Sequence, residues 1–224
     1  SALMQVTEAV AVSAPKRSRS DYRASEDKVP CRAFNLAGLE DSLYIAEPGK
    51  RLYLDWLELA GEGAPTYDAL APLLGRGRFI GVDTDPGVVA RCKARKLPNA
   101  VFHRGHLQSL LADRPADFER VGVLNYDSLA GWHSDSIITE TAACVGFAAE
   151  QYRRCGEFVL IVNADTRNHS SDVVMPRVRR LFAPLLGPLE RQVEDADCFW
   201  YKTAGGRSKM LNVRVRLGFE TLRF

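Results

Sequence analysis

The stretch RFIGVDTDPGVVARCKA, Arg78 to Ala94, joins a short apolar run to a helical pattern through two carboxylates. The run predicts a buried β-strand over 78–83, and the residues from Pro86 onward predict a helix over 86–96. Asp85 directly precedes Pro86, which is the arrangement of an N-cap followed by proline at the first helical position. Asp83 ends the strand. Two interpretations stay open for it: a solvated turn, or a carboxylate that accepts hydrogen bonds from ligand hydroxyls.

The same alternation continues along the chain and decides the fold class. Further apolar runs predict strands over 100–104, 120–126 and 157–164, and helical patterns occupy 107–118, 134–154 and 170–187. Strands that alternate with helices of this length are typical of an α/β protein with a parallel sheet. Two strand-like runs then flank Gly205 and Gly206. They predict that the sheet ends in an antiparallel β-hairpin.

Composition divides the chain into two regions. Residues 1–29 are polar and lack apolar periodicity, so we expect a flexible N-terminal arm, followed by one α/β domain over 30–224. The arm carries the basic run Lys16–Ser20 (KRSRS), which is either a tail that contacts phosphate or a solubilising terminus.

Several classes of protein are disfavoured. Thirty basic and 28 acidic residues leave a net charge of +2, so any basic surface must be local. The five cysteines include no CxxC pair and the four histidines no HxxxH spacing, so we expect neither a disulfide framework nor a metal site. No apolar run reaches the roughly 18 residues of a membrane span. We therefore expect a soluble, cytoplasmic protein without membrane contact.

Polar residues follow each predicted strand, and the carboxyl ends of parallel strands form one ligand-binding edge. Gly105, His106 and Leu107 follow the strand at 100–104. Asn125, Tyr126, Asp127 and Ser128 follow the next one, where an amide, a phenol and a carboxylate can orient a nucleophile and remove a proton. A plain turn with an Asx-type cap is the other reading of these four residues. Trp132 and His133, in the loop beyond, either line a pocket or pack.

In this order the parts resemble the class I S-adenosylmethionine-dependent methyltransferases. The resemblance covers roughly 52–219 and rests on GVDTDP, FHRGHLQSLL, VLNYDS, EFVLIVN and the final hairpin. It implies a Rossmann-like, mostly parallel sheet with helices on both faces, and S-adenosylmethionine as the cofactor. It also implies cofactor contacts from Asp83 and Thr84, with Asp83 on the ribose, and from Gly105, His106 and Leu107 near adenine. Asn125, Tyr126 and Asp127 would be the catalytic residues that face the methyl acceptor.

Two departures from the family pattern bear on these expectations. The family's glycine-rich first loop is matched only by LELAGEGAP, which places Glu58, Gly61 and Gly63 near the methionine part of the cofactor. The same region also reads as a helix with a glycine cap, because Leu52, Trp56 and Leu59 fall on one helical face. His106 stands where the family usually has an aspartate; it either accepts the adenine hydrogen bond or is a surface histidine.

The C-terminal hairpin suggests a partner. Basic residues outnumber acidic ones six to one between Lys202 and Arg223. We expect a nucleic-acid substrate to contact this hairpin through its cations, although edge strands also carry charge to block pairing. Those cations are Lys202, Arg207, Lys209, Arg214 and Arg216, with Arg177, Arg179 and Arg180 on the preceding helix. The substrate motif departs from the (Asp/Asn)-Pro-Pro-(Tyr/Phe) of amino-methylating DNA enzymes, so it assigns no base chemistry.

The sequence therefore predicts an S-adenosylmethionine-dependent methyltransferase whose acceptor is unassigned, nucleic acid being one candidate. The alternative is a methyltransferase-like fold that has lost catalysis and serves as a binding or assembly module. A nicotinamide dehydrogenase is disfavoured, because no GxGxxG follows a strand.

Overall fold

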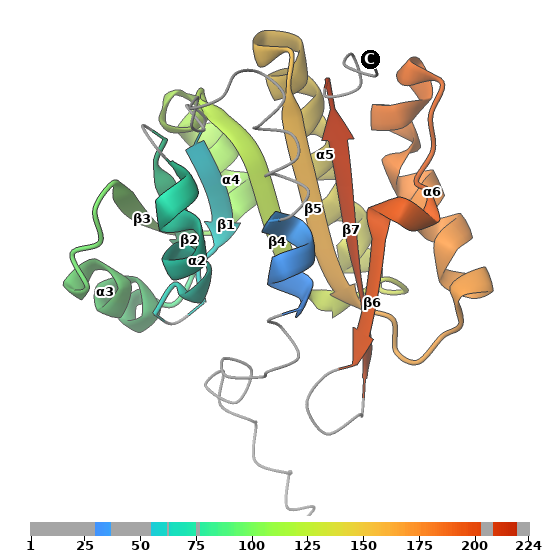
Figure 1. The fold of residues 1–224 in the computed structure, drawn as a ribbon, viewed down its shortest axis with the longest axis horizontal. Helices are drawn as coiled ribbons and strands as arrows, with labels where there is room; N and C mark the ends of the chain where they lie inside the picture. The colour runs from blue at the N-terminus through green and yellow to red at the C-terminus, as the bar shows by residue number, and fades with distance from the viewer. Residues whose placement is uncertain (1–29, 37–54, 62, 75–76, 203–207, 219–224) are drawn as a thin grey trace, which may run out of the picture.

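The computed structural model describes residues 30–36, 55–61, 63–74, 77–202 and 208–218. Within these ranges, seven strands form one sheet in the order β3-β2-β1-β4-β5-β7-β6 (Figure 1). The strands are β1 (Asp55–Leu59), β2 (Phe79–Asp83), β3 (Ala100–Arg104), β4 (Val121–Gly131), β5 (Phe158–Asp165), β6 (Cys198–Lys202) and β7 (Lys209–Leu217). The helices are one at 30–36, α2 (Pro65–Leu74), α3 (Pro86–Ala94), α4 (Leu107–Asp113), α5 (Asp135–Cys155) and α6 (Ser171–Leu186), with 3-10 turns η2 (Pro115–Phe118), η3 (Gly187–Leu189) and η4 (Asp195–Asp197).

The sheet has one topological switch point. Strands β1 to β5 are parallel. The switch point lies between β1 and β4, because β2 and β3 follow β1 toward one edge of the sheet and β5 follows β4 toward the other. In open parallel sheets, ligands bind at the carboxyl ends of the strands at such a point. The carboxyl ends lie along the lower edge of the sheet in Figure 1, which we call the carboxyl edge.

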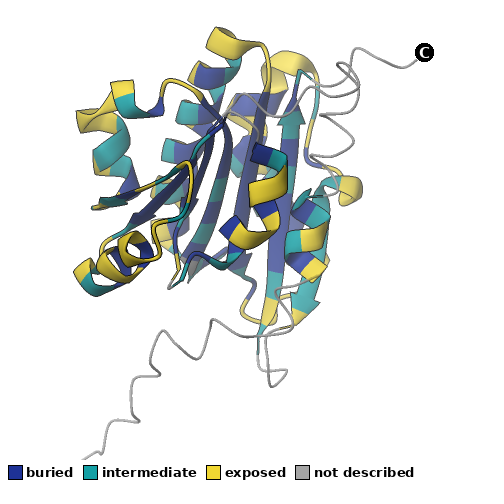
Figure 2. Ribbon diagram, turned by 60° about the vertical axis from the view of Figure 1, so that its left-hand side comes forward, coloured by how far each residue is buried: buried dark blue, intermediate teal, exposed yellow. Residues whose placement is uncertain are grey.

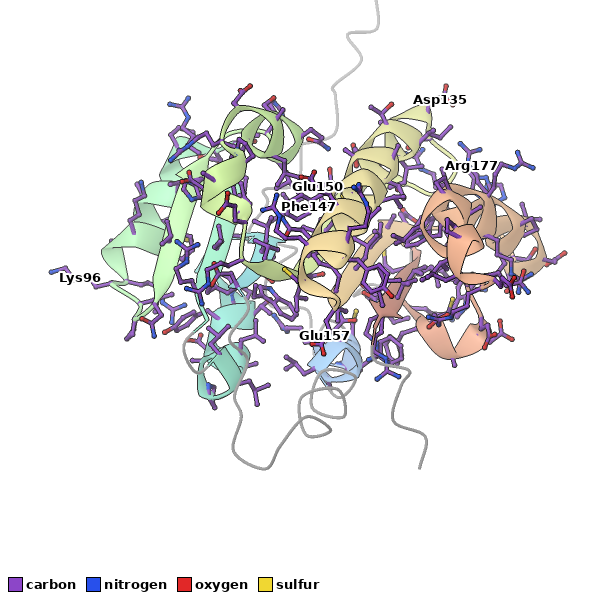
Figure 3. The ribbon with its side chains drawn as sticks, turned by 90° about the horizontal axis from the view of Figure 1, so that it is seen from above. Lys96, Asp135, Phe147, Glu150, Glu157 and Arg177 are labelled. Carbon is purple, nitrogen blue, oxygen red and sulfur yellow. The ribbon has the colours of Figure 1, made fainter. Side chains whose placement is uncertain are left out.

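Helices cover both faces of the sheet (Figures 2 and 3). Helices α2 and α3 pack on one face, around Trp56, Phe79 and Phe102. Helices α4, α5 and α6 pack on the other, around Leu57, Leu124 and other buried residues. Because both faces are buried, side chains on each side of the central strands are apolar, as in other parallel sheets. The predicted Rossmann-like architecture with two helical layers is confirmed.

Helix 30–36 joins the α2 and α3 side and is tied to β7 and β6. The amides of Asn35 and Asn212 exchange two hydrogen bonds, at 2.8 and 3.3 Å. Phe34 stacks on Phe199 with ring centroids 5.2 Å apart, and the Arg214 guanidinium lies 4.1 Å from the Phe34 ring centroid. This short helix thus covers the sheet face beside β7 and β6, near the carboxyl end of β5.

Most predicted elements are confirmed, with bounds that differ by a few residues. Residues 55–59 form a strand, so the helical reading of that segment is wrong: Trp56 and Leu57 are both buried because β1 lies between β2 and β4, and its two apolar faces mimic helical spacing. Strand β4 runs to Gly131 because its ladder with β5 resumes after a register shift. The helix expected over 107–118 ends at Asp113, and Pro115 opens a 3-10 turn. Helix α2 was not predicted.

The C-terminal hairpin is also confirmed. Strand β7 pairs antiparallel with both β5 and β6, so it inserts between them. The predicted turn at Gly205 and Gly206 lies outside the described residues, as do the arm at 1–29 and Arg207. None of the helices in the described ranges combines the length and the apolar composition that crossing a bilayer requires.

Candidate functional site

The switch point brings two polar side chains together. Strands β1 and β4 pair there in parallel, with Glu58 opposite Asn125. The Asn125 amide nitrogen donates to Glu58 Oε2 at 3.2 Å, and Trp56 Nε1 donates to the same oxygen at 3.0 Å. Both residues were predicted site residues, one assigned to the cofactor and one to the acceptor. The hydrogen bond joins the two halves of the proposed site across the point where strand order reverses.

Glu58 is an unusual carboxyl group. Its side chain lies in the interior, with the residue only 3% exposed, and burial raises its pKa to about 7. Hydrogen bonds from Trp56, Asn125 and Thr66 oppose the rise, and the nearby Asp127 carboxylate adds to it. A buried carboxylate is costly unless a positive group or donors compensate it. At the carboxyl end of β1, this group is suited to hold the cationic part of a ligand.

Asp83 and Asp85 divide as the sequence predicts for their local structure. Asp85 Oδ1 accepts from the backbone nitrogens of Gly87 and Val88, at 2.7 and 3.3 Å, so it is the N-cap of α3. Asp83 is half-buried at the end of β2, and its Oδ1 accepts from the Asp85 backbone nitrogen at 2.8 Å. Since β2 neighbours β1, the Asp83 carboxylate lies one strand away from Glu58 at the carboxyl edge.

The loop after β1 is open on one side. An added Cβ at Gly61 or Gly63 would meet no atom within 4 Å, so space adjoins both residues. Gly63 has a φ of 77°, and Ala64 follows with a φ of 45° while fully buried. Positive φ suits glycine, so the strained position at Ala64 is held by its packing against α2 residues. The predicted glycines thus provide backbone next to open space, as a loop that approaches a ligand needs.

The residues after β3 occupy three different settings. Gly105 has a φ of 153°, and its backbone nitrogen donates to the Asp83 carbonyl at 3.0 Å, which fixes this turn beside the end of β2. His106 is exposed at the N-cap of α4 and makes no side-chain cap bond. Leu107 is buried in the core on the α4 side. Thr84 is exposed beside Asp83.

The residues of β4 alternate between the two faces of the sheet. Asn125 and Asp127 share the face of Glu58, whereas Tyr126 is buried in the opposite core, where Gln108 Nε2 donates to its hydroxyl at 3.3 Å. The pKa of the Tyr126 hydroxyl is raised, and burial is the largest cause of the rise. Ser128 also faces the α5 side, and its hydroxyl donates to Glu140. The structure therefore groups Asn125 and Asp127 with Glu58, and it separates Tyr126 from them.

Comparison with solved structures bears on the fold. No family model and no curated protein matches the chain. The plantazolicin methyltransferase BamL, solved with S-adenosylhomocysteine (SAH), superposes with a TM-score of 0.57 at 9% identity, covering 89% of this chain and 88% of BamL. Weaker similarity links it to Aeropyrum pernix fibrillarin bound to S-adenosylmethionine (TM-score 0.48, 16% identity, 79% and 74% covered). The chain has the fold of the class I S-adenosylmethionine-dependent methyltransferases.

On this methyltransferase fold, Asn163 of β5 is a polar residue that sequence reasoning missed. It lies opposite Asp127 in the β4–β5 ladder, and its amide nitrogen donates to Asp127 Oδ1 and to the Tyr201 hydroxyl, both at 2.8 Å. The residue is 5% exposed, and Asn163 Oδ1 has no hydrogen-bond partner among the described residues. The signal was present in FVLIVNAD, because an amide interrupts an otherwise apolar strand near its carboxyl end.

The loops after β4 and β5 bring two histidines together. The ring centroids of His133 and His169 lie 4.0 Å apart, and burial, aided by His169 and Arg177, lowers the pKa of His133. Trp132, predicted either to line a pocket or to pack, packs: it is fully buried and its Nε1 donates to the Leu211 carbonyl at 3.2 Å. Among the described residues, no group of three or more potential ligands gathers to hold a metal ion.

The predicted basic hairpin places its cations in unequal settings. Lys202 and Lys209 are exposed, and they border a hollow of about 350 Å³ with Trp200 and His169. Arg214 instead packs on Phe34 of helix 30–36 and donates to its carbonyl. Since the start of β7 lies beside the end of β5, the hollow opens near the carboxyl edge.

Proposed function

We propose that this protein binds S-adenosylmethionine and transfers its methyl group to an acceptor held at the carboxyl ends of β4 and β5. The observation that carries the proposal is Glu58, a buried carboxyl group at the switch point of a methyltransferase fold, with Asp83 on the adjacent strand. When bound, the cofactor supplies a methyl group activated by a positively charged sulfur. The described residues that donate hydrogen bonds to Glu58 are all neutral, so this buried carboxyl group is compatible with a cationic ligand.

Each side of the proposed site has a distinct role. Asp83 would accept hydrogen bonds from ribose hydroxyls, because a carboxylate can accept from two donors at once. The backbone of Gly61 and Gly63 would adjoin the methionine part, with Glu58 near its positive charge. Asn125, Asp127 and Asn163 would orient the acceptor. Within the described ranges, Asn163 Oδ1 lacks a hydrogen-bond partner, and an N–H or O–H of the acceptor would donate to it. Methyl transfer depends mainly on such positioning.

The acceptor we propose is a nucleic acid, contacted through the hairpin. The support is local charge: Lys202 and Lys209 border a hollow near the carboxyl edge, and Trp200 adds an aromatic surface on which a base can stack. Arg214 contributes less, because its guanidinium already packs on Phe34.

Calorimetry with S-adenosylmethionine and its demethylated product tests cofactor binding. Two variants form a matched pair, because they remove neighbouring carboxylates with different partners. We expect Asp83→Ala to weaken cofactor affinity at least tenfold, and Asp85→Ala to leave affinity unchanged while costing about 1 kcal/mol of stability through the lost helix cap. Equal behaviour of the two variants would contradict the assignment of Asp83.

A second readout concerns Glu58. With a pKa of about 7, it is about half protonated at pH 7, and a cation bound beside it would favour the ionised form. Cofactor binding at pH 7 should therefore release about half a proton, measured as a dependence of the binding enthalpy on the ionisation enthalpy of the buffer. If millimolar cofactor gives no heat and no thermal stabilisation, methyl transfer is excluded and the binding-module alternative is favoured.

A further inference from the structure

A second basic surface lies at the opposite end of the sheet from the hairpin. Between Arg91 and Arg104 the chain has five basic residues and no acidic one. This segment forms the end of α3, the following loop and β3. Strand β3 is the first in the sheet order and pairs with β2 alone among the described strands, so it forms one edge of the sheet. No part of the proposed methyl-transfer site lies on this edge strand itself.

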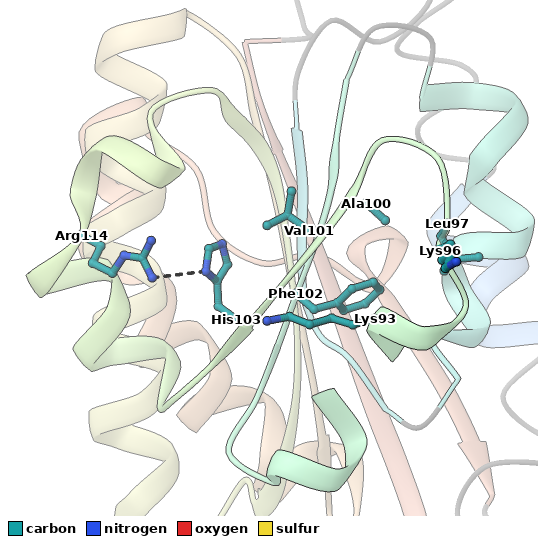
Figure 4. A pocket seen from close by; sticks show the side chains of 8 residues that line it. All are labelled: Lys93, Lys96, Leu97, Ala100, Val101, Phe102, His103 and Arg114. Atoms are coloured by element: carbon teal, nitrogen blue, oxygen red, sulfur yellow. Dashed lines mark hydrogen bonds between the residues drawn. The ribbon is translucent and has the colours of Figure 1, made fainter. Parts of the chain in front are cut away.

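The surface is hollowed into a groove of about 470 Å³ beside β3 (Figure 4). Lys96, in the loop after α3, lines one side, and Lys93 at the end of α3 extends from there along β3; both are exposed. His103 and Arg114 line the other, where an Arg114 guanidinium nitrogen lies 3.4 Å from His103 Nδ1. Val101 of β3 lies between them with 36% of its surface exposed. None of the residues that line the groove is acidic.

The charges around the groove are incompletely compensated. Arg114 forms an ion pair with Asp117 at 2.5 Å, whereas no acidic residue lines the groove beside Lys93 and Lys96. The pKa of His103 is lowered, first by burial and then by Arg114, with smaller contributions from Lys93 and Arg78 in the same direction and from Asp117 against it. The potential beside β3 is therefore positive, and it favours an anionic occupant.

The groove runs along β3, from residues that precede the strand to His103 next to its carboxyl end. Lys96 and Leu97 precede β3, and Ala100 is its first residue, so the groove begins near the amino ends of the strands. Strands in a sheet lie about 4.8 Å apart, and six such spacings separate β3 from β6, which is roughly 29 Å. A molecule in the groove would leave the hollow at Lys202 and Lys209 accessible.

We propose that the groove beside β3 binds the sugar-phosphate backbone of a nucleic acid, as a docking surface apart from the site of methyl transfer. Lysines and an arginine along the groove suit a chain of regularly spaced phosphates, which are recognised by charge without regard to base sequence. An acidic peptide that pairs with the edge strand is the other possible occupant. Strand β3 has only five residues, and only alternate ones present their backbone groups outward, so few main-chain hydrogen bonds would form. The structure therefore favours the nucleic acid.

Fluorescence anisotropy with a labelled oligouridylate of about 20 nucleotides tests the proposal. The variant Lys93→Ala/Lys96→Ala removes two exposed cations from the groove. Its matched control, Arg153→Ala/Arg154→Ala, removes two exposed cations from the end of α5, neither of which lines the groove. Thermal melts and cofactor calorimetry on both variants establish that folding and the methyl-transfer site are unaffected.

We expect a loss of affinity that depends on salt. Each phosphate contact on a single strand contributes about 0.7 to the slope of log K against log salt, so two contacts contribute about 1.4. The groove variant should bind roughly 25-fold more weakly than the wild type at about 0.1 M salt and roughly fivefold more weakly at about 0.3 M. The control should bind within about twofold of the wild type at both concentrations.

Three results would overturn the proposal: equal losses in the two double variants, no loss in the groove variant, or wild-type binding too weak to detect at about 0.1 M salt. Tighter, groove-dependent binding of labelled polyglutamate than of RNA would assign the groove to an acidic protein instead. The proposal does not depend on cofactor binding: a protein that binds RNA through the groove but no S-adenosylmethionine would refute the proposed function alone.

Discussion

Replacing Glu58 with glutamine tests the central physical claim about the site, that a carboxyl group is buried at the switch point without a compensating charge. The amide has the same shape, and its oxygen can still accept from Trp56 and Asn125. Only the ability to ionise is lost. The variant should therefore keep the fold and change how stability depends on pH.

The sign follows from the pKa, which rises from 4.5 in the unfolded chain to about 7 in the folded protein. Below both values the group is protonated in both states and contributes nothing. As pH rises, the unfolded chain releases the proton first, so Glu58 destabilises the folded protein progressively until both states are ionised. The cost is about 1 kcal/mol at pH 5, about 2 kcal/mol at pH 6 and about 3 kcal/mol at pH 8.

Urea denaturation at pH 5, 6, 7 and 8 measures this difference. Relative to the wild type, Glu58→Gln should gain about 2 kcal/mol of unfolding free energy between pH 5 and pH 8, whatever constant offset the substitution adds. The control is Glu150→Gln on α5, because Glu150 is exposed and pairs with Arg154 at the surface. A difference between Glu58→Gln and wild type that does not change with pH would refute the raised pKa, and with it the argument for a cationic ligand.

Two further variants test the packing that positions the site. An added Cβ at Gly81 would lie 2.5 Å from the Phe102 ring and 2.7 Å from the Ala60 Cβ. We therefore expect Gly81→Ala to cost about 1–3 kcal/mol by chemical denaturation, and a neutral effect would show that β2 and β3 are less tightly packed than described. Arg78 pairs with the fully buried Asp55 at 2.6 Å. Arg78→Ala should lower the free energy of unfolding by about 3 kcal/mol, because it leaves the buried Asp55 carboxylate without its ion-pair partner. The double variant Arg78→Ala/Asp55→Asn should recover part of that loss, because it removes the buried charge as well.

The candidate site was partly predictable because its residues follow strands in a regular order. Asp83, Asn125 and Asp127 could be named since polar residues that end apolar runs collect at one edge of a parallel sheet. Tyr126 was grouped with them by proximity in sequence, yet the alternation of β4 sends its side chain into the opposite core. Residues neighbouring in sequence on a strand point to opposite faces, so an acceptor motif read as a continuous string combines two environments.

Four features follow from the amino-acid sequence without any tertiary contact: the alternation of strands and helices, the hairpin at the end, the Asp85 cap and the local excess of positive charge. These are properties of short segments, set by periodicity, capping and composition. Contacts between distant segments were needed to establish that β1 is a strand, that Glu58 contacts Asn125, that Asn163 contacts Asp127, and that two lysines of 91–104 line a groove. The physical reason is that burial, pKa and charge compensation depend on which distant segments become neighbours, and that is settled by strand order rather than by any local pattern.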